Sequence, residues 1–567
     1  MTLFEQLCQA RGLTGRKLAE FITPNYAAGH DPFLLPDMQA AVDRLVAAHE
    51  RDEHITIYGD YDIDGLTATT VLLDALEQFG FGHVEAFIPN RFVEGYGLTI
   101  DAIERIAATG ATLIITVDCG SLSEKEIIRA NELGVDVIVT DHHNVAAVQP
   151  PAVAVINPKR LLQDYPDAYE NFRLKPGADT KELYPFLDLP GVGVAFKLVQ
   201  ALQTKLDRLP RGQEKWLLDL VALGTVCDVV SLVDENRMHV YWGLNVLART
   251  RRPGLKALMA VARVQPNELN ARHMGFGLGP RMNAAGRLET ARYALEMLRS
   301  TDSIKALELA QQLDDMNIAR RSEQDEIVRQ AIIAAEQYIK DPVLVVSGPG
   351  WNHGIIGIVA AKLLEKYKKP TFVLEEMGDE SRGSARSYGD FSAADAIRAS
   401  DDLITRGGGH KLAAGVTLPT ANIMAFRTRV NEYFYSLQLR PQPPLLLAAA
   451  DVTVEAFTDV GERLVEELSQ LEPYGNGNSE PVLMIANALV VAMRRMGAEA
   501  QHVKLSLQDD QGKVIDMIAF SAEPEWFQEP GARVAAWFQP IINEWQGRRT
   551  IEGKIVRLEV VNEGVIC

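Results

Sequence analysis

The length and composition are those of an ordinary globular protein with several domains. The chain has 567 residues, of which 47% are hydrophobic and 23% charged, and its formal net charge is −19. At roughly 100–200 residues per domain, this length predicts three or four domains. An acidic total excludes a uniformly basic surface, so any nucleic-acid site must be a local gathering of basic residues.

Cysteine usage and the N-terminus favour a cytoplasmic protein. The cysteines show no CxxC spacing, which argues against a disulfide-stapled protein or a structural zinc site. Glu5 stands where a signal peptide needs an apolar core, and the chain lacks the run of roughly 18 apolar residues that a membrane span requires. No membrane association is therefore expected.

The first part of the chain alternates short apolar runs with helical patterns. Buried strands are predicted at 54–60, 84–89, 111–118, 135–141 and 152–158, with helices at 67–80, 99–110 and 123–134 between them. Such a βαβ rhythm favours a mostly parallel, doubly wound sheet, because a crossover helix is what joins parallel strands at this spacing.

The rest of the chain is helical, then α/β, then β. Residues 214–230 indicate a buried helix, and 301–340 indicate one long helix or two that could act as a spacer. A second α/β unit is predicted from strands at 343–348 and 371–374 and a helix at 355–367. A linker is expected at 441–444. Beyond it, a small barrel is predicted from strands at 502–508, 513–520, 532–540 and 549–560, with a hairpin turn at 509–512.

Acidic and imidazole side chains follow three of the predicted strands. They are Asp60, Asp62 and Asp64 in DYDIDG, Asp118 in VDCGS, and Asp141, His142 and His143 in TDHHN. Because ligands bind beyond the carboxyl ends of parallel strands, these side chains are expected to converge at one edge of the sheet. Like charges 4 Å apart repel by about 4 kcal/mol at an effective dielectric constant of 20, and a pair of divalent cations would relieve that repulsion.

The mixture of ligands indicates which metals. Mostly oxygen ligands with a few imidazoles favour Mn²⁺ or Mg²⁺ over zinc or copper. Two such ions can activate a water and stabilise the leaving oxygen of a phosphoryl displacement. A single Asp at a strand end is more often a cap or turn residue, and a His pair is more often a packed feature. The coincidence of three such segments favours a two-metal phosphodiesterase.

These segments resemble the DHH phosphoesterase superfamily, named after the triplet that stands here at 141–143. DYDIDG, VDCGS and TDHHN are similar to its first three motifs, and LGTVCDVVSL, which contains Asp228, is similar to its fourth. GWNHGIIG (350–357), GSARS (383–387) and GGGH (407–410) resemble its DHHA1-type substrate-binding domain. With PRMNAAGRL (280–288) and EGYGL (94–98), nearly the whole chain resembles the RecJ branch of single-strand-specific 5′→3′ DNA exonucleases.

The resemblance implies an order of domains and a set of ligands. The domains are an N-terminal helical segment (1–50), a DHH catalytic domain (51–240), a helical connector (241–340), a DHHA1-type substrate-binding domain (341–440) and an OB-fold that binds single-stranded DNA (441–567). Metal ligands are implied at Asp60, Asp62, Asp64, Asp118, His142 and Asp228. Asp141 and His143 are either shared ligands or orienting residues. Without the resemblance, Asp228 would be a polar residue that ends a buried helix.

The resemblance also implies substrate contacts. Arg91 and Tyr96 suit a phosphate contact and a stacking or wedging ring, unless Tyr96 only packs a turn. Recognition of the 5′ end is implied for Arg281, Arg287, Ser384 and Arg386, because an arginine fork binds a terminal phosphate bidentately. Gly407, Gly408 and Gly409 would let backbone N–H groups approach phosphates, although a flexible turn has the same pattern, and His353 and His410 flank these motifs. GVGVAF (191–196) lacks the context of a dinucleotide motif and indicates a helix start.

The predicted barrel carries basic and aromatic side chains suited to a single strand. They are Arg494, Arg495, Lys504, Arg548, Arg549, Trp537 and Trp545, and both tryptophans could equally pack the barrel core. The function expected is hydrolysis of single-stranded DNA from its 5′ end to mononucleotides, in recombination and repair. A helicase and a single-strand-binding protein are expected beside a monomeric enzyme. The rivals are a phosphodiesterase for short or cyclic dinucleotides and a non-catalytic module that holds DNA ends.

Overall fold

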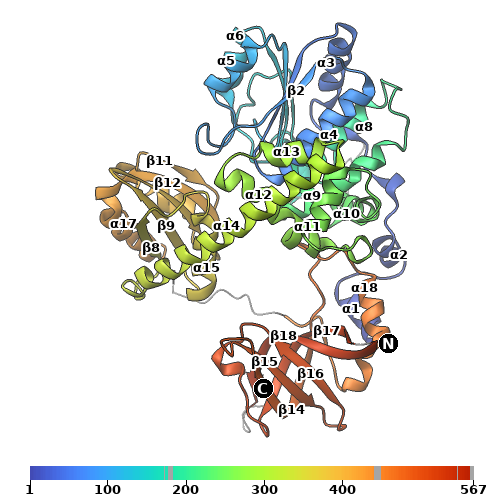
Figure 1. Cartoon of the computed structure of the whole chain (residues 1–567), viewed down its shortest axis with the longest axis vertical. Coiled ribbons are helices and arrows are strands. Elements are labelled where there is room, and N and C mark those ends of the chain that lie inside the picture. The colour runs from blue at the N-terminus through green and yellow to red at the C-terminus, as the bar shows by residue number, and fades with distance from the viewer. Residues whose placement is uncertain (171–172, 176–182, 440–448, 546, 562–567) are drawn as a thin grey trace.

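The chain forms two α/β domains, a helical connector and a β-barrel (Figure 1). The computed structural model describes residues 1–170, 173–175, 183–439, 449–545 and 547–561. The linker predicted at 441–444 lies outside the described residues. The predicted fold class, with a parallel-sheet domain first and a barrel last, is confirmed.

The first domain is the predicted parallel sheet. Its five strands run in the order β2-β1-β3-β4-β5 and all pair in parallel. Their bounds are Ile55–Gly59 (β1), Val84–Phe87 (β2), Leu113–Val117 (β3), Asp136–Thr140 (β4) and Ala154–Ile156 (β5). The crossover helices are Ile63–Phe79 (α4), Ile100–Ala108 (α5) and Glu124–Glu132 (α6). Helix α4 begins four residues earlier than the sequence predicts, because the Asp62 carboxylate caps it by accepting the Asp64 and Gly65 N–H groups.

Helices cover this sheet and extend from it. They are Met38–Glu50 (α3), Gly191–Leu202 (α8), Leu218–Cys227 (α9), Asp234–Leu247 (α10), Pro253–Val261 (α11), Gly279–Leu288 (α12) and Arg292–Arg299 (α13). Helix α9 is buried, as predicted, and ends at Cys227 so that Asp228 is its C-cap. The long pattern at 301–340 is one helix, α14 (Ser303–Glu336), which crosses from the first domain to the second α/β domain (Figure 1).

The second α/β domain is a mixed sheet in the order β11-β12-β10-β9-β8. Its elements are Leu344–Pro349 (β8), Ile356–Tyr367 (α15), Thr371–Met377 (β9), Glu380–Arg386 (β10), Ala393–Arg398 (α16), Arg406–Gly409 (β11), Ala413–Pro419 (β12) and Ile423–Ser436 (α17). The three glycines at 407–409 form an edge strand paired with β12, where the sequence suggested a glycine loop or turn. Small residues face one another there because β12 brings Ala414 and Gly415 opposite them.

The C-terminal domain is a closed barrel. It consists of Leu483–Met496 (β14), His502–Gln508 (β15), Val514–Ala519 (β16), Arg533–Trp545 (β17) and Arg548–Val560 (β18), with the pairing of β14 to β17 completing the closure. The predicted hairpin joins β15 to β16. Strand β14 escaped prediction because bulges at 485–488 and 490–492 break the alternation of apolar and polar residues.

The barrel also shows on which side of its wall one of the two tryptophans lies. Val534, Ala536 and Phe538 point into its core, so Trp537 points outward, where the Arg557 guanidinium lies 4.2 Å from its ring centre. The side chain of Trp545 lies outside the described part of the chain.

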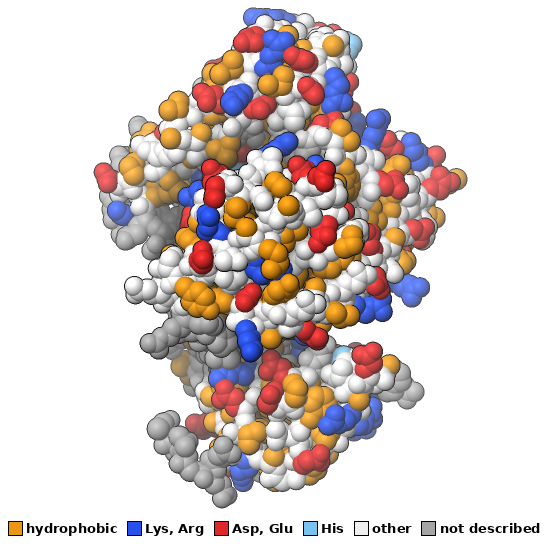
Figure 2. Space-filling model, turned by 90° about the vertical axis from the view of Figure 1, so that its left-hand side faces the viewer, with side chains coloured by type: hydrophobic (Ala, Val, Ile, Leu, Met, Phe, Trp, Pro, Cys, Tyr) orange, Lys and Arg blue, Asp and Glu red, His pale blue; other side chains and the backbone are white. Residues whose placement is uncertain are grey.

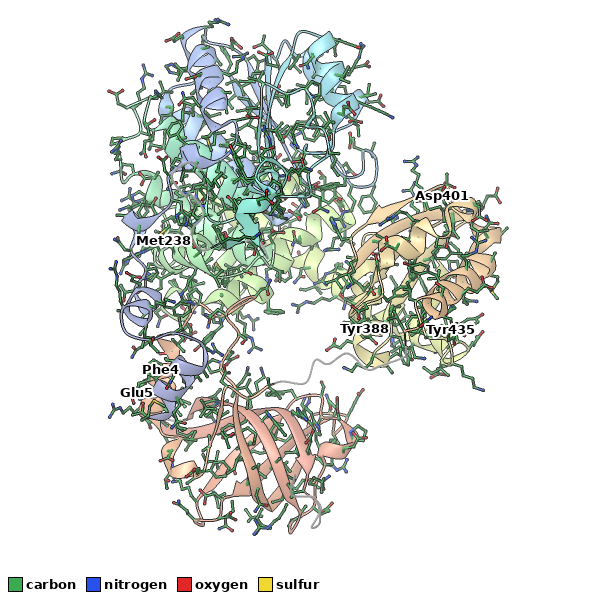
Figure 3. All side chains as sticks on the ribbon, turned by 180° about the vertical axis from the view of Figure 1, so that it is seen from behind. Phe4, Glu5, Met238, Tyr388, Asp401 and Tyr435 are labelled. Atoms are coloured by element: carbon green, nitrogen blue, oxygen red, sulfur yellow. The ribbon has the colours of Figure 1, made fainter. Side chains whose placement is uncertain are left out.

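The N-terminal segment does not form a domain of its own. Helix α1 (Leu3–Ala10) buries Leu7 and Cys8 in the barrel core, whereas α3 packs on the first domain. Figure 3 labels Phe4 and Glu5 beside the barrel and Met238 in the first domain above it. Over the described residues on the face shown in Figure 2, acidic and basic side chains are interspersed. None of the helices in the described ranges is long and apolar enough to cross a membrane.

Candidate active site

The structure gathers the predicted acidic and imidazole residues at the carboxyl edge of the first sheet. Asp60 follows β1, Asp118 follows β3 and the triplet follows β4, while Asp228 arrives from the end of α9. Three sets of ligand atoms each lie within 4.8 Å of one another: Asp60, Asp62 and Asp118; Asp64, His142 and Asp228; and Asp118, His142 and His143. Asp118 adopts a left-handed backbone conformation with φ 62°, which few residues other than Gly, Asn and Asp tolerate. This backbone conformation at the strand end directs the Asp118 carboxylate towards the other carboxylates.

Four of these residues present buried ligand atoms that have no hydrogen-bond partner. The atoms are Asp60 Oδ1, Asp118 Oδ1, His142 Nε2 and Asp228 Oδ2. His142 Nε2 is 3.1 Å from Asp118 Oδ1, yet the two atoms lack the alignment of a hydrogen bond. Buried polar atoms are rarely left unpaired, because each costs about 1–3 kcal/mol. Convergent, unpaired carboxylate and imidazole atoms are therefore a fit for divalent cations.

The pKa values of the cluster also fit a site for divalent cations. Burial, and next the neighbouring carboxylates, raise the pKa values of Asp60, Asp118 and Asp228 well above the ordinary value. Burial and then Asp62 raise the pKa of Asp64 to about 7. Burial and then His143 lower the pKa of His142 to about 3, so its imidazole is neutral and keeps a lone pair for a metal.

Asp64 is held by a helix that the sequence assigned only a structural role. The N–H groups of Gly191 and Val192, at the start of α8, donate to its two carboxylate oxygens at 2.6 and 2.8 Å. A Cβ on Gly191 would lie 2.7 Å from the Asp118 Cβ, so only glycine allows this approach. The GVGVAF segment is the helix start that the sequence predicts, and it also positions the carboxylate cluster.

Asp141 and His143 are arranged differently from the other six. The Asp141 carboxylate accepts hydrogen bonds from the N–H groups of Ser121, His142 and His143, at 2.7 to 3.1 Å, and lies 2.9 Å from His143 Nδ1. Burial opposes ionisation of Asp141, but His143 outweighs it and holds the pKa of that carboxyl below its usual range. Burial also opposes charge on His143, but the hydrogen bond with Asp141 raises its pKa. This geometry suits Asp141 as the residue that orients the His143 imidazole and holds the backbone of both histidines.

Tyr96 lies at the mouth of the cluster. Its hydroxyl donates to the Asp118 backbone carbonyl at 3.3 Å and is 3.2 Å from His143 Nδ1, while 54% of the residue is exposed. The hydroxyl fixes one end of the ring, and the ring itself remains available to a base. The Tyr96 hydroxyl therefore contacts two of the predicted site residues.

A group of arginines lies near the carboxylate cluster. The Arg91 guanidinium lies 4.3 Å from the Tyr61 ring centre, and Arg287 donates to the Gly354 carbonyl. Burial, and then Arg91 and another buried arginine, Arg320, lower the pKa of Arg287 to about 10, with Asp62 acting in the opposite sense. Arg386 donates to the Ser384 hydroxyl at 3.2 Å, and burial lowers its pKa as well. We call Arg91, Arg287, Arg320 and Arg386 the arginine cluster.

Arg320 is the member that sequence reasoning missed. It lies on α14, is 8% exposed, and donates to the side-chain carbonyls of Asn317 and Gln324. The signal was present, because polar residues at positions i, i+3 and i+7 of the long helix share one face with its buried apolar residues. A row of buried polar residues on one face of a helix indicates a site, whereas the polar residues of a solvated face would be exposed.

Three family models match the chain: the DHH family N-terminal domain over 54–225, the DHHA1 domain over 340–436 and the RecJ OB domain over 451–557. The single-stranded-DNA-specific exonuclease RecJ of Bacillus subtilis is 37% identical over 96% of this chain and 66% of its own length. The protein of that name from Salmonella typhimurium is 32% identical over 91% of this chain and 89% of its own length. The chain belongs to the RecJ family.

A solved RecJ structure extends this likeness to the whole fold. The crystal structure of RecJ in complex with Mn²⁺ from Thermus thermophilus superposes with a TM-score of 0.82 and 28% identity, covering 98% of this chain and 75% of that one. The present RecJ-family chain thus spans about two thirds of the Bacillus relative and three quarters of the Thermus structure.

Three other predicted substrate residues of this RecJ-family chain make contacts of their own outside the arginine cluster. Arg281 pairs with Asp314 at 2.8 Å and donates to the Gly277 carbonyl, so the structure does not bring it into the arginine cluster. His353 lies beside Phe92, with Nδ1 2.9 Å from Glu375 and Nε2 buried and unpartnered. His410, after the exposed edge strand of Gly407–Gly409, is 3.2 Å from the Asn144 amide.

Two of the five predicted basic residues of the barrel are paired with acids. Lys504 lies 3.0 Å from both Asp516 and Glu552, and Arg549 is 3.1 Å from Glu462. Arg495 stacks 4.3 Å from the Phe527 ring centre. Arg494, Arg495 and Arg548 are exposed.

Proposed function

We propose that this protein hydrolyses single-stranded DNA from its 5′ end to 5′-mononucleotides, using two Mn²⁺ or Mg²⁺ ions held by the carboxylate cluster. As a member of the RecJ family it is a single-stranded-DNA-specific exonuclease. The observation that carries the metal assignment is the convergence of four buried, unpartnered ligand atoms from four segments. Divalent ions supply an activated water and neutralise charge at the scissile phosphate.

The ligand sets proposed for the two ions overlap at Asp118. One ion would be held by Asp60, Asp62 and Asp118, and the other by Asp64, His142 and Asp228. Asp118 Oδ1 lies 3.1 Å from His142 Nε2, so it can serve both sets. Asp141 and His143 would hold the ligating side chains in place, because Asp141 accepts hydrogen bonds from the backbone of both histidines.

The arginine cluster is proposed to bind the 5′-terminal phosphate. Its members repel one another, and burial makes their charge costly, as the lowered pKa of Arg287 records. A dianionic phosphate would relieve both costs and accept charge-assisted hydrogen bonds. Ser384 contributes a hydroxyl beside Arg386, and the unpartnered His353 Nε2 a further polar atom. Because Asn283, on the helix that carries Arg287, accepts the Ile63 N–H at 3.0 Å, a phosphate bound at Arg287 would lie beside the loop of Asp60, Asp62 and Asp64.

Strand selectivity is proposed to come from stacking. The exposed ring of Tyr96 stands beside Asp118, and a stacked base contributes about 1–3 kcal/mol without sequence preference. Gly407, Gly408, Gly409 and His410 would contact the backbone, and Trp537 on the barrel would stack bases further along. The proposed units are thus the catalytic domain (51–240), the connector (241–340), the 5′-end domain (341–440) and the strand-binding barrel (441–567).

The cellular setting is proposed to be DNA recombination and repair in the cytoplasm. A helicase would supply single strands, and single-strand-binding protein would coat them. The enzyme is proposed to act as a monomer. The described cysteines Cys8, Cys119 and Cys227 are thiols, as a reducing compartment favours.

A strand of about 30 nucleotides, labelled at its 5′ end and incubated with Mn²⁺, tests this function. Release of the label as a mononucleotide is the expected outcome, and a duplex of the same sequence should resist. A strand labelled at its 3′ end serves as the control, since its label should remain on long fragments early in the reaction. Cleavage confined to dinucleotides would instead identify a dinucleotide phosphodiesterase, and binding without cleavage a DNA-end-binding module.

A further inference from the structure

Two stretches of the chain run between the barrel and the first domain. One is the N-terminal segment, where α1 packs on the barrel and α2 (Arg16–Ile22) leads to the first domain. The other is residues 472–478, which lead into β14 (Figure 1). In Figure 3, Phe4 and Glu5 mark the barrel end of the first stretch, and Met238 marks the helix that receives both.

Arg237, on that helix α10, holds both stretches at once. Its Nε and Nη2 donate to the Phe21 carbonyl at 3.1 and 3.0 Å. Nη2 also donates to the Glu472 carbonyl at 2.8 Å, and Nη1 to the Pro473 carbonyl at 3.3 Å. The guanidinium lies 3.6 Å from the Phe21 ring centre, and the residue is 3% exposed. One side chain thus joins the first domain to the two segments that carry the barrel.

The bonding groups at this junction indicate that Arg237 is needed for the direction of its hydrogen bonds. Within the described ranges, Arg237 forms no ion pair with a carboxylate. A buried charge without a counter-ion is expensive, and an apolar side chain would often be at least as stable. An arginine has five N–H donors spread over a rigid planar fork and can bond three carbonyls that lie in fixed, separate directions, whereas the three donors of a lysine start from a single nitrogen on a flexible stem. The residue therefore fits a role in fixing the angle between segments.

The same junction reaches the proposed metal site. The Asn476 carbonyl accepts the Leu232 N–H at 2.7 Å, and the Asn476 amide donates to the Val229 carbonyl at 2.9 Å. Val229 follows Asp228 directly and has a φ of 61°, which is unfavourable for a β-branched residue. The segment that carries the barrel is therefore hydrogen-bonded to the loop that leaves the metal cluster.

We propose that Arg237 is a positioning residue that fixes the barrel relative to the metal site, so that a strand lying on the barrel feeds its 5′ end to the cluster. This proposal rests on the exonuclease function given above. Substrates that occupy the barrel should depend on Arg237, whereas substrates too short to reach it should not. A trinucleotide is shorter than the roughly 4–16 nucleotides that an OB-fold occupies.

The test compares kcat/KM for a 5′-phosphorylated trinucleotide and for a strand of about 60 nucleotides. In Arg237→Met, the value for the long strand should fall about 5- to 10-fold, while the value for the trinucleotide stays within about twofold. Arg237→Lys should recover part of the loss, and Phe21→Leu, which keeps the carbonyl and removes the stacked ring, should give a smaller loss. Equal losses on both substrates, or no loss on either, would overturn the proposal.

A matched control separates this role from stability. Arg427 is also buried, donates to the Val345 carbonyl and stacks 3.5 Å from the Tyr338 ring centre, but all three residues belong to the second α/β domain and its edge. Arg427→Met should lower Tm and leave the ratio of the two kcat/KM values unchanged. If Arg237→Met does not fold, Phe21→Leu and Arg237→Lys carry the test, with small-angle scattering expected to show a wider spread of dimensions. A wild-type enzyme that fails on the long strand would instead refute the exonuclease function.

Discussion

The carboxylate cluster and the arginine cluster are two groups of like charge that lie near each other, and they differ in how the chain supports them. The carboxylate cluster lies at the edge of one parallel sheet. Its residues come from four segments, and each stands within a few residues of the end of a strand or a helix. The arginine cluster is assembled from distant pieces, namely the loop after β2, helices α12 and α14, and strand β10. The first is set by one fold, and the second depends on how two domains and a connector meet.

This difference shows how a nuclease can separate cleavage of the phosphodiester bond from selection of the substrate. Each cluster is costly alone, because like charges are held out of water. Each is relieved by a ligand of the opposite sign, metal cations for the carboxylates and a phosphate for the arginines. In the proposed complex the metals relieve the first cluster and the 5′-terminal phosphate relieves the second, so both costs are relieved when the metals and a 5′ end are in place.

Replacing Asp118 should have the largest effect on activity. Asp118→Ala removes the carboxylate shared by both proposed ligand sets, so kcat with Mn²⁺ should fall by at least about 10³-fold. The arginine cluster should be unaffected, and binding of a 5′-phosphorylated strand, measured by fluorescence anisotropy, should stay within about threefold. A variant that still degrades the strand would remove Asp118 from the metal site, and a loss of binding would show that the clusters are not independent.

Replacing Arg287 should separate the second cluster from the first. Arg287→Met removes a charged donor from the proposed phosphate site, so KM for a 5′-phosphorylated strand should rise about 10- to 100-fold. A 5′-hydroxyl strand should be affected much less. Arg281→Met is the matched control, since Arg281 lies on the same helix but pairs with Asp314, and it should change neither KM. Equal effects of the two variants would contradict the division of roles.

The sequence predicted the carboxylate cluster better than the arginine cluster, for a physical reason. Strand-end aspartates follow from periodicity, since parallel strands place their carboxyl ends together whatever the rest of the chain does. Arg320 could not be found this way, because its place depends on α14 being one helix that spans two domains. The ion pair of Arg281 could not be found for the same reason, since Asp314, which pairs with it, lies on that helix. The edge strand at 407–409 depends on pairing with β12, which local composition does not show.

Replacing Tyr96 should have an intermediate effect on strand use. Tyr96→Ala removes the exposed ring and should lower kcat/KM on a single strand about tenfold, in keeping with one lost stacking contact. Tyr96→Phe keeps the ring and loses only the hydroxyl, with its contacts to the Asp118 carbonyl and His143 Nδ1, so its loss should be about threefold or less. If the Phe variant is as impaired as the Ala variant, the hydroxyl rather than the ring is what the site needs.

The smallest effect, on stability, tests whether the carboxylate cluster is costly without metal. Burial and Asp62 raise the pKa of Asp64 to about 7 in the folded protein, against about 3.9 in an unfolded chain. Between these values the folded state binds a proton that the unfolded state has lost, so stability decreases as the pH rises through this window and levels off above it. The Tm of metal-free wild type should therefore fall relative to that of Asp64→Asn, by about 5 °C between roughly pH 5 and pH 8. Mn²⁺ should reverse the loss in the wild type more than in the variant, and a difference that does not vary with pH would mean that the cluster carries no such strain.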